Sequence, residues 1–264
     1  LPKDSDKMAA TYARLAAAAK SADAVLMFAG IDHSLDSEGR DRTSLEFPQV
    51  QAALIHHLVQ ANPRTIVTLI NGSPLELGGW LDDVPAVLEA WYPGMEGGNA
   101  IADAIFGKID PSGKLPFTWP KHLADSPAYA VGDQNNDRVE YKEGVLVGYR
   151  YFDTDKVTPQ FPFGFGLSYT TFKFSHLTVT RAGDDLKVSF EVANTGDRAG
   201  AEVAQVYVAP PAGDVKRPVH ELEGFQKIFL QPGAQQTVEL ELDRQAFACY
   251  DEATSGWVLP PGTY

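Results

Sequence analysis

Apolar positions in the first part of the chain change repeatedly between helical and strand-like spacing. Met8, Tyr12 and Leu15 lie on one helical face, which predicts a helix over 5–22. The elements expected next are a strand over 24–29, a helix between Pro48 and Asn62, strands over 65–70 and 85–90, and a helix over 98–106. The run over 24–29 is continuously apolar, as in a strand buried on both faces. This alternation implies an α/β sandwich, a mostly parallel sheet flanked by helices.

The composition changes after Pro111 to Pro, Gly and aromatic residues without helical periodicity. We expect residues 1–119 to form the α/β domain and residues 120–168 to form an ordered linker. The aromatic runs at 149–152 and 161–166 are too dense for a disordered tether. The linker should therefore pack against a domain surface.

Alternation of apolar and polar residues dominates the last part of the chain. Clear strands are expected over 186–192, 202–208 and 237–242. Turn residues lie between them at 194–197 and 231–233. The pattern predicts an all-β sandwich of the immunoglobulin or fibronectin type III kind over 169–264. The ending Pro-Pro-Gly-Thr-Tyr is typical of the approach to another strand, so we expect the last strand to be missing.

Composition narrows the range of partners. The 264 residues carry a net charge of −13 with no cluster of Lys and Arg, which argues against nucleic acid. No apolar run is long enough to cross a membrane, and the start Leu1-Pro2-Lys3-Asp4 does not resemble a signal peptide. The single cysteine, Cys249, excludes an internal disulfide, and its apolar neighbours predict a core position.

Candidate chemistry is concentrated in the loop 32–42, directly after the first expected strand. It holds one His, four carboxylates and two Arg in eleven positions. Ligands of parallel sheets gather where strands end, and this set of side chains suits glycosidic or phosphoryl chemistry. A plain charged loop is the alternative, with Asp41 and Arg42 tying it to the next helix.

Other chemistries have weaker support in the sequence. His33 has no second His four residues on, and the carboxylates lack the spacing of a calcium loop, so we expect no metal and no cofactor. The glycines of 94–98 lack the lysine of a phosphate loop, and we expect them to begin a helix. Ser73 precedes Pro74 and lies outside any nucleophile elbow, so a turn explains it.

Six motifs occur in an order that resembles glycoside hydrolase family 3. They are Ser37-Glu38-Gly39-Arg40-Asp41-Arg42-Thr43, Asn71-Gly72-Ser73-Pro74, Trp91-Tyr92-Pro93-Gly94-Met95-Glu96-Gly97-Gly98, Pro111-Ser112-Gly113-Lys114-Leu115-Pro116, Val147-Gly148-Tyr149-Arg150-Tyr151-Phe152, and Phe161-Pro162-Phe163-Gly164-Phe165-Gly166-Leu167-Ser168-Tyr169. The last three, with Trp91 and Tyr92, are interpreted mainly as turns and ring packing, either in the core or between domains.

The resemblance implies a retaining β-glucosidase built from a TIM-like barrel, an α/β sandwich and a fibronectin-like domain. It implies that Glu38 is the general acid/base and that the nucleophile is an Asp in a Ser-Asp-Trp motif on the barrel. This chain has neither that motif nor a barrel, so we expect a part of a longer protein that is inactive alone. An extra domain inserted ahead of residue 1 is a further hypothesis.

The remaining expectations concern neighbours of Glu38 and partners of the chain. Asp41 should pair with Arg42 and keep that charge turned away, and Arg40 is a candidate contact for a polar leaving group. Expected partners are a β-glucoside or oligosaccharide and the barrel of the same protein, in the periplasm or outside the cell. A homodimer stays open, as do a β-xylosidase and a non-catalytic carbohydrate-binding scaffold.

Overall fold

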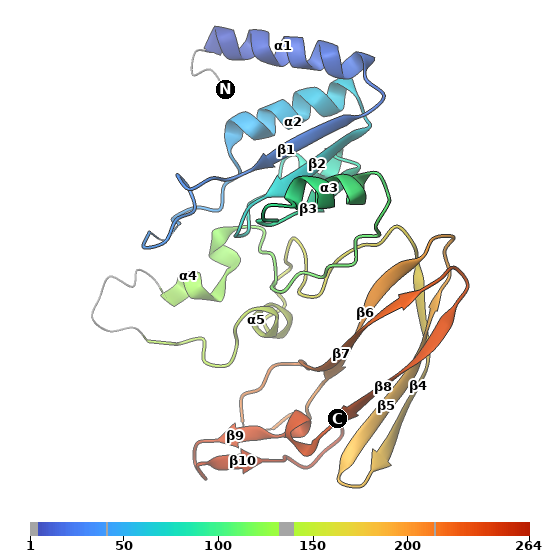
Figure 1. Ribbon diagram of the computed structural model, residues 1–264. Helices are drawn as coiled ribbons and strands as arrows, with labels where there is room; N and C mark the ends of the chain where they lie inside the picture. Colours follow the sequence, from blue (N-terminus) through green and yellow to red (C-terminus); the bar gives the residue numbers. More distant parts are fainter. Residues whose placement is uncertain (1–4, 41, 132–139, 214) are drawn as a thin grey trace. The chain divides into compact units, whose positions relative to one another are not determined.

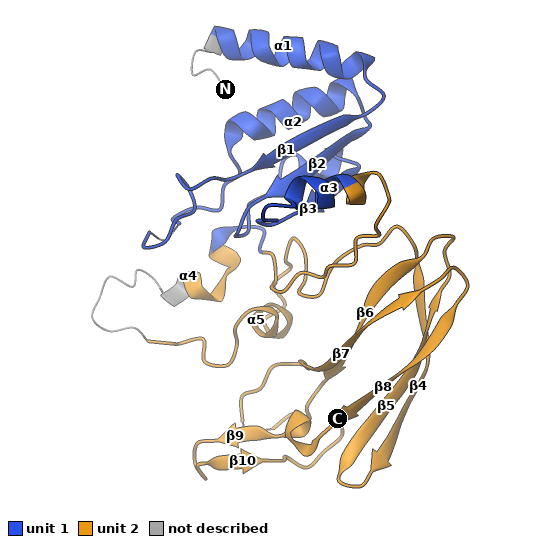
Figure 2. Cartoon of the chain, in the orientation of Figure 1, with its two compact units in different colours: residues 1–102, 120–123 blue, residues 103–119, 124–264 orange. Residues whose placement is uncertain are grey.

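The computed structural model describes residues 5–40, 42–131, 140–213 and 215–264. The chain divides into two compact units (Figure 2). One comprises residues 1–102 with 120–123, and the other comprises 103–119 with 124–264. Within the described ranges, no helix combines the length and the apolar composition that a membrane crossing requires.

The first unit contains a parallel three-stranded sheet in the order β1-β2-β3 (Figure 1). Its elements are α1 (Ser5–Ser21), β1 (Val25–Gly30), α2 (Gln49–Ala61), β2 (Thr65–Ile70), η1 (Leu81–Asp83) and β3 (Ala86–Glu89), followed by α3 (Gly97–Ile105). Pro48 precedes α2, and Asn62 ends it by donating its backbone N–H to Leu58. The predicted parallel sheet and flanking helices are confirmed, and the glycines of 94–98 lead into a helix as expected.

The core of this unit lies between the helices and one face of the sheet. Tyr12 and Ala19 of α1 are buried together with Leu54 and Leu58 of α2. The partly buried residues packed against them include Val25 and Met27 of β1.

The prediction that β1 is buried on both faces is wrong. Leu26 is 40% exposed and Phe28 is 52% exposed. Their neighbours Val25 and Met27 pack on the helices, and side chains of a strand alternate between its faces. A continuous apolar run indicates two covered faces only if the fold supplies a cover for each, and the described residues cover the second face only in part.

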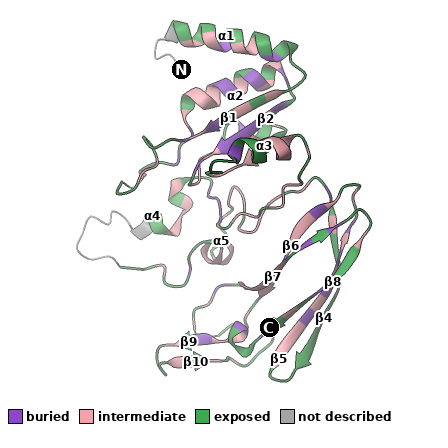
Figure 3. Cartoon of the chain, viewed as in Figure 1, coloured by how far each residue is buried: buried purple, intermediate pink, exposed green. Residues whose placement is uncertain are grey.

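The second unit contains the expected β-sandwich. Its strands are β4 (Phe172–Ala182), β5 (Asp185–Asn194), β6 (Gly200–Val208), β7 (Glu221–Leu230), β8 (Gln235–Leu242), β9 (Cys249–Asp251) and β10 (Gly256–Val258). They pair antiparallel as β4-β5-β8, as β6-β7 and as a β9-β10 hairpin, and η3 (Arg244–Phe247) precedes β9. Buried residues come from β5 and β8 as well as from β6 and β7 (Figure 3). Cys249 is buried, as predicted.

A buried asparagine fixes the turn after β5. The Asn194 side chain donates to the carbonyls of Arg198 and Leu230 and accepts from the Thr170 hydroxyl and the Gly196 amide. Each polar group of this amide side chain therefore has a partner, so its burial carries little penalty.

The stretch between the sheet and the sandwich is held by aromatic packing and backbone pairing. It contains η2 (Leu123–Asp125), α4 (Pro127–Val131) and α5 (Tyr149–Thr154). Leu115 exchanges backbone hydrogen bonds with Phe165 and Gly164, each 2.8 Å long. The rings of Phe161 and Phe165 stack with centroids 4.9 Å apart. The ring and backbone packing predicted for the motifs at 111–116 and 161–169 is therefore present.

Replacing Leu230 with alanine should destabilise the sandwich, because this side chain is only 5% exposed in its core. Leu→Ala at such a site costs about 2–5 kcal/mol in the free energy of unfolding. Leu177 of β4 is 68% exposed, so Leu177→Ala is the control, with a change of about 0.5 kcal/mol or less. Urea unfolding measures both, and equal effects would contradict the assigned core.

Candidate active site

The loops after β1, β2 and β3 leave the same edge of the sheet, because parallel strands all end at one side. The predicted loop 32–42 follows β1, the Asn71-Gly72-Ser73-Pro74 turn follows β2, and Trp91 and Tyr92 follow β3. Three motifs that are far apart in sequence thus meet at the carboxyl edge of the sheet.

The loop after β1 begins at Gly30, whose backbone N–H and carbonyl are both held by one side chain. The Gln51 side chain of α2 accepts from the Gly30 N–H and donates to the Gly30 carbonyl, both at 2.9 Å. Gly30 has a φ of 148°, and a Cβ there would lie 1.9 Å from the Ile70 carbonyl oxygen. Only glycine fits this close approach to β2, so the starting point of the loop is fixed.

The first half of the loop is a polar turn closed by Asp32. Its carboxylate accepts from the Ser34 backbone N–H and hydroxyl, and its carbonyl accepts from the amides of Leu35 and Asp36. The hydrogen bonds from Ser34 lower the pKa of Asp32, because they favour the ionised form.

Glu38 lies at the tip of a tight turn. Ser37 and Arg40 form an antiparallel bridge, and Glu38 and Gly39 are the two residues between them. Gly39 has a φ of 75°, as the third residue of a type II turn requires. The Glu38 side chain is exposed, so the fold presents this carboxyl group at the sheet edge.

Both arginines of the loop are held by backbone or hydroxyl oxygens. Arg40 donates to the Ser34 carbonyl, and Arg42 donates to the Ser73 hydroxyl (2.8 Å) and the Pro74 carbonyl (3.0 Å). Burial lowers the pKa of Arg42, whereas the nearby Asp36 raises it. Asp41 lies outside the described residues, so its predicted pairing with Arg42 stays a prediction, as does the contact of Arg40 with a leaving group.

Tyr92 belongs to this site, so the expectation of a core position is wrong, whereas packing between domains stays a prediction. Tyr92 is 55% exposed, and its hydroxyl donates to Asp36 Oδ2 at 2.9 Å. Desolvation and then the Asp36 carboxylate raise the pKa of Tyr92. The preceding Trp91 has a φ of 52°, and this left-handed residue turns the chain after β3.

Glu89 is a residue of this edge that sequence patterning did not single out. It ends β3 and accepts from the Trp91 N–H at 2.8 Å and from Asn71 Nδ2 at 3.4 Å. Burial raises the pKa of its carboxyl group to about 7. The available signal was a lone carboxylate in an apolar strand, at the end that faces the loops.

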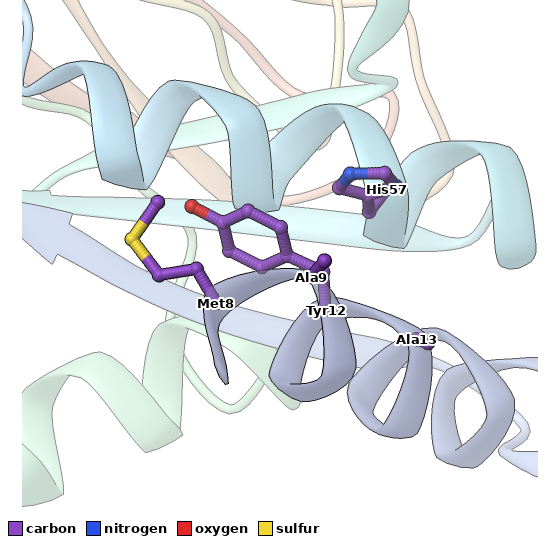
Figure 4. A pocket seen from close by; sticks show the side chains of 5 residues that line it. All are labelled: Met8, Ala9, Tyr12, Ala13 and His57. Atoms are coloured by element: carbon purple, nitrogen blue, oxygen red, sulfur yellow. The ribbon is translucent and has the colours of Figure 1, made fainter. Parts of the chain in front are cut away.

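An apolar cavity of about 360 Å³ lies elsewhere, between α1 and α2 (Figure 4). Its lining residues are Met8, Ala9, Tyr12, Ala13 and His57. The lining contains no carboxyl group, so it lacks the pair of acids that glycoside chemistry uses. In the part of the chain that the structure describes, no three His, Cys, Asp or Glu side chains are grouped to hold a metal ion.

Comparison with protein families covers most of the chain. The model of the glycosyl hydrolase family 3 C-terminal domain matches residues 5–169, and that of a fibronectin type III-like domain matches residues 202–264. Thermostable beta-glucosidase B of Acetivibrio thermocellus is 44% identical over 251 residues, which are 94% of this chain and 33% of that protein. An exo-alpha-(1->6)-L-arabinopyranosidase of Bifidobacterium breve is 43% identical over 247 residues, 93% of this chain and 33% of that protein.

Solved structures agree with these matches. A GH3 beta-glucosidase of Bifidobacterium adolescentis superposes with a TM-score of 0.94 at 41% identity, over 99% of this chain and 38% of that one. A beta-glucosidase of Kluyveromyces marxianus in complex with glucose superposes with a TM-score of 0.90 at 38% identity, over 97% and 31% of the two chains. The chain thus spans about a third of the length of the proteins it matches.

The raised pKa of Glu89 predicts a pH-dependent stability. The folded chain retains a proton up to about pH 7 that an ordinary Glu, at 4.5, has already released. The unfolded state therefore binds fewer protons over this window, and this group makes stability fall as pH rises from about 4.5 to about 7, by up to about 3 kcal/mol.

The variant Glu89→Gln should remove this fall while keeping an acceptor for the Trp91 N–H. Denaturant unfolding at several pH values measures the effect. Glu252 is exposed, so Glu252→Gln is the control and should leave the pH dependence unchanged. The same pH dependence in Glu89→Gln and in the unmodified chain would contradict the assignment.

Proposed function

The chain belongs to glycoside hydrolase family 3, and we propose that it supplies Glu38 as the general acid/base of a retaining β-glucosidase. The observation that carries the proposal is the placement of Glu38 at the tip of the 37–40 turn, exposed at the carboxyl edge of the sheet. The nucleophile is an aspartate on a barrel domain of the same polypeptide, and the chain alone is inactive.

The reaction needs two carboxyl groups about 5 to 5.5 Å apart. The aspartate attacks the anomeric carbon while the bond to the leaving oxygen breaks and Glu38 gives its proton to that oxygen. Water then attacks the glycosyl–enzyme ester and gives a proton to the Glu38 carboxylate. The product sugar leaves with its β configuration, and both carboxyl groups return to their starting states.

The arginines near Glu38 are arranged compatibly with an acid role. A guanidinium paired with a carboxyl group favours its ionised form, which cannot donate a proton. Arg40 is bonded to the Ser34 carbonyl and Arg42 to the turn after β2. Over the residues that the structure describes, neither arginine forms an ion pair with Glu38.

We propose a terminal β-D-glucosyl group as substrate, because β-glucosidases predominate among the relatives and solved structures. The 43% identical arabinopyranosidase supports an α-L-arabinopyranoside as a second candidate. A β-xyloside is the alternative that the sequence leaves open. Initial rates on the three aryl glycosides separate these substrates.

The variant Glu38→Ala of the full-length protein tests the assignment. General acid-base catalysis contributes about 10²- to 10⁴-fold in rate, so turnover of an aryl β-glucoside with a good leaving group should fall by a factor in this range. Azide should restore part of it, because this anion attacks the glycosyl–enzyme without a general base. Chromatography of the products checks for β-glucosyl azide.

Glu46 provides the matched control, because it is an exposed Glu of the same connection between β1 and α2. Glu46→Ala should retain activity and show no azide dependence. Near-normal turnover by Glu38→Ala without azide would remove Glu38 from the mechanism, and Asp36 would be the next carboxylate to examine.

A further inference from the structure

One phenol connects the three loops at the carboxyl edge of the sheet. Tyr92, after β3, donates its hydroxyl hydrogen to Asp36 Oδ2 in the loop after β1, at 2.9 Å. The Tyr92 ring lies against Gly72, in the turn after β2. Tyr92 therefore links segments from three strands, through its hydroxyl to the loop after β1 and through its ring to the turn after β2.

We propose that Tyr92 is a positioning residue for Glu38, acting through Asp36, an inference that rests on the function proposed above. Asp36 directly precedes Ser37, the first residue of the bridged turn that has Glu38 at its tip. Anchoring the Asp36 side chain to Tyr92 fixes one end of this short turn. Because the Glu38 side chain is exposed, its location depends on the turn that carries it.

The surroundings are shaped for this contact. A Cβ at Gly72 would lie 2.4 Å from Tyr92 Cε2 and 3.1 Å from Asp36 Oδ2, so glycine makes room for both partners. Trp91, just before Tyr92, has a left-handed backbone, which is strained for a bulky residue. The Glu89 carboxylate accepts the Trp91 N–H and so stabilises this conformation. Several groups thus maintain the direction in which Tyr92 points.

The role predicts a defect that depends on the leaving group. A proton donor matters most when the departing oxygen is strongly basic, as in phenyl β-glucoside, and least when it is weakly basic, as in dinitrophenyl β-glucoside. A displaced Glu38 should therefore lower kcat/KM for the phenyl substrate more than for the dinitrophenyl substrate. Loss of folded enzyme alone lowers kcat/KM for both substrates by the same factor.

The experiment compares variants of the full-length protein by the ratio of kcat/KM for dinitrophenyl over phenyl glycoside, on the sugar that the unmodified enzyme prefers. Glu38→Ala should raise this ratio by about 10²-fold or more, and Tyr92→Phe by roughly tenfold. Tyr12→Phe is the matched control, because its hydroxyl also donates one hydrogen bond in this unit, to the Val50 carbonyl at 3.1 Å. It should leave the ratio within about twofold.

A double-mutant cycle separates positioning through Asp36 from an independent effect. If Tyr92 acts through Asp36, Asp36→Ala should raise the ratio as Tyr92→Phe does, and the double variant should raise it no further. Additive changes would overturn the proposed route through Asp36.

Two failures are distinguishable. An unchanged ratio in Tyr92→Phe, alongside a raised ratio in Glu38→Ala, would overturn the positioning role and leave the proposed function intact. An unchanged ratio in Glu38→Ala would refute both.

Discussion

Parallel pairing of β1, β2 and β3 is the constraint on which the site depends. It sends three successive loops to one edge of the sheet, and their polar groups satisfy one another there. Arg42 joins the first loop to the second, Asn71 and Glu89 join the second to the third, and Tyr92 joins the third to the first. These contacts between the loops fix the position of the exposed turn that carries Glu38.

The hydrogen-bonded contacts between these loops come with unfavourable burial and backbone conformations. Glu89 is largely desolvated, Trp91 has a left-handed backbone, and a side chain at Gly30 or Gly72 would collide with neighbouring atoms. The desolvated carboxyl group and the left-handed backbone each lower stability, and they persist where surrounding contacts determine the conformation. Their concentration at one edge of the sheet agrees with a site that needs fixed geometry more than local stability.

The second unit follows a simpler physical rule. Alternating side chains of two antiparallel sheets form one apolar core, and the buried Asn194 has partners for all its polar atoms. Ring stacking and short backbone bonds fix the stretch that precedes the sandwich. Structure in this unit comes mainly from apolar burial.

The sequence by itself determined the order of helices and strands in the first unit, the parallel sheet, the presence of a β-sandwich and the loop that carries Glu38, because periodicity and turn residues act over a few neighbours. Only the tertiary structure decided that Tyr92 contacts Asp36, since these residues are 56 positions apart. The same holds for the raised pKa of Glu89 and the exposed face of β1, because burial depends on what covers a residue. Local patterns specify elements, whereas contacts between loops arise only when strand pairing brings their ends together.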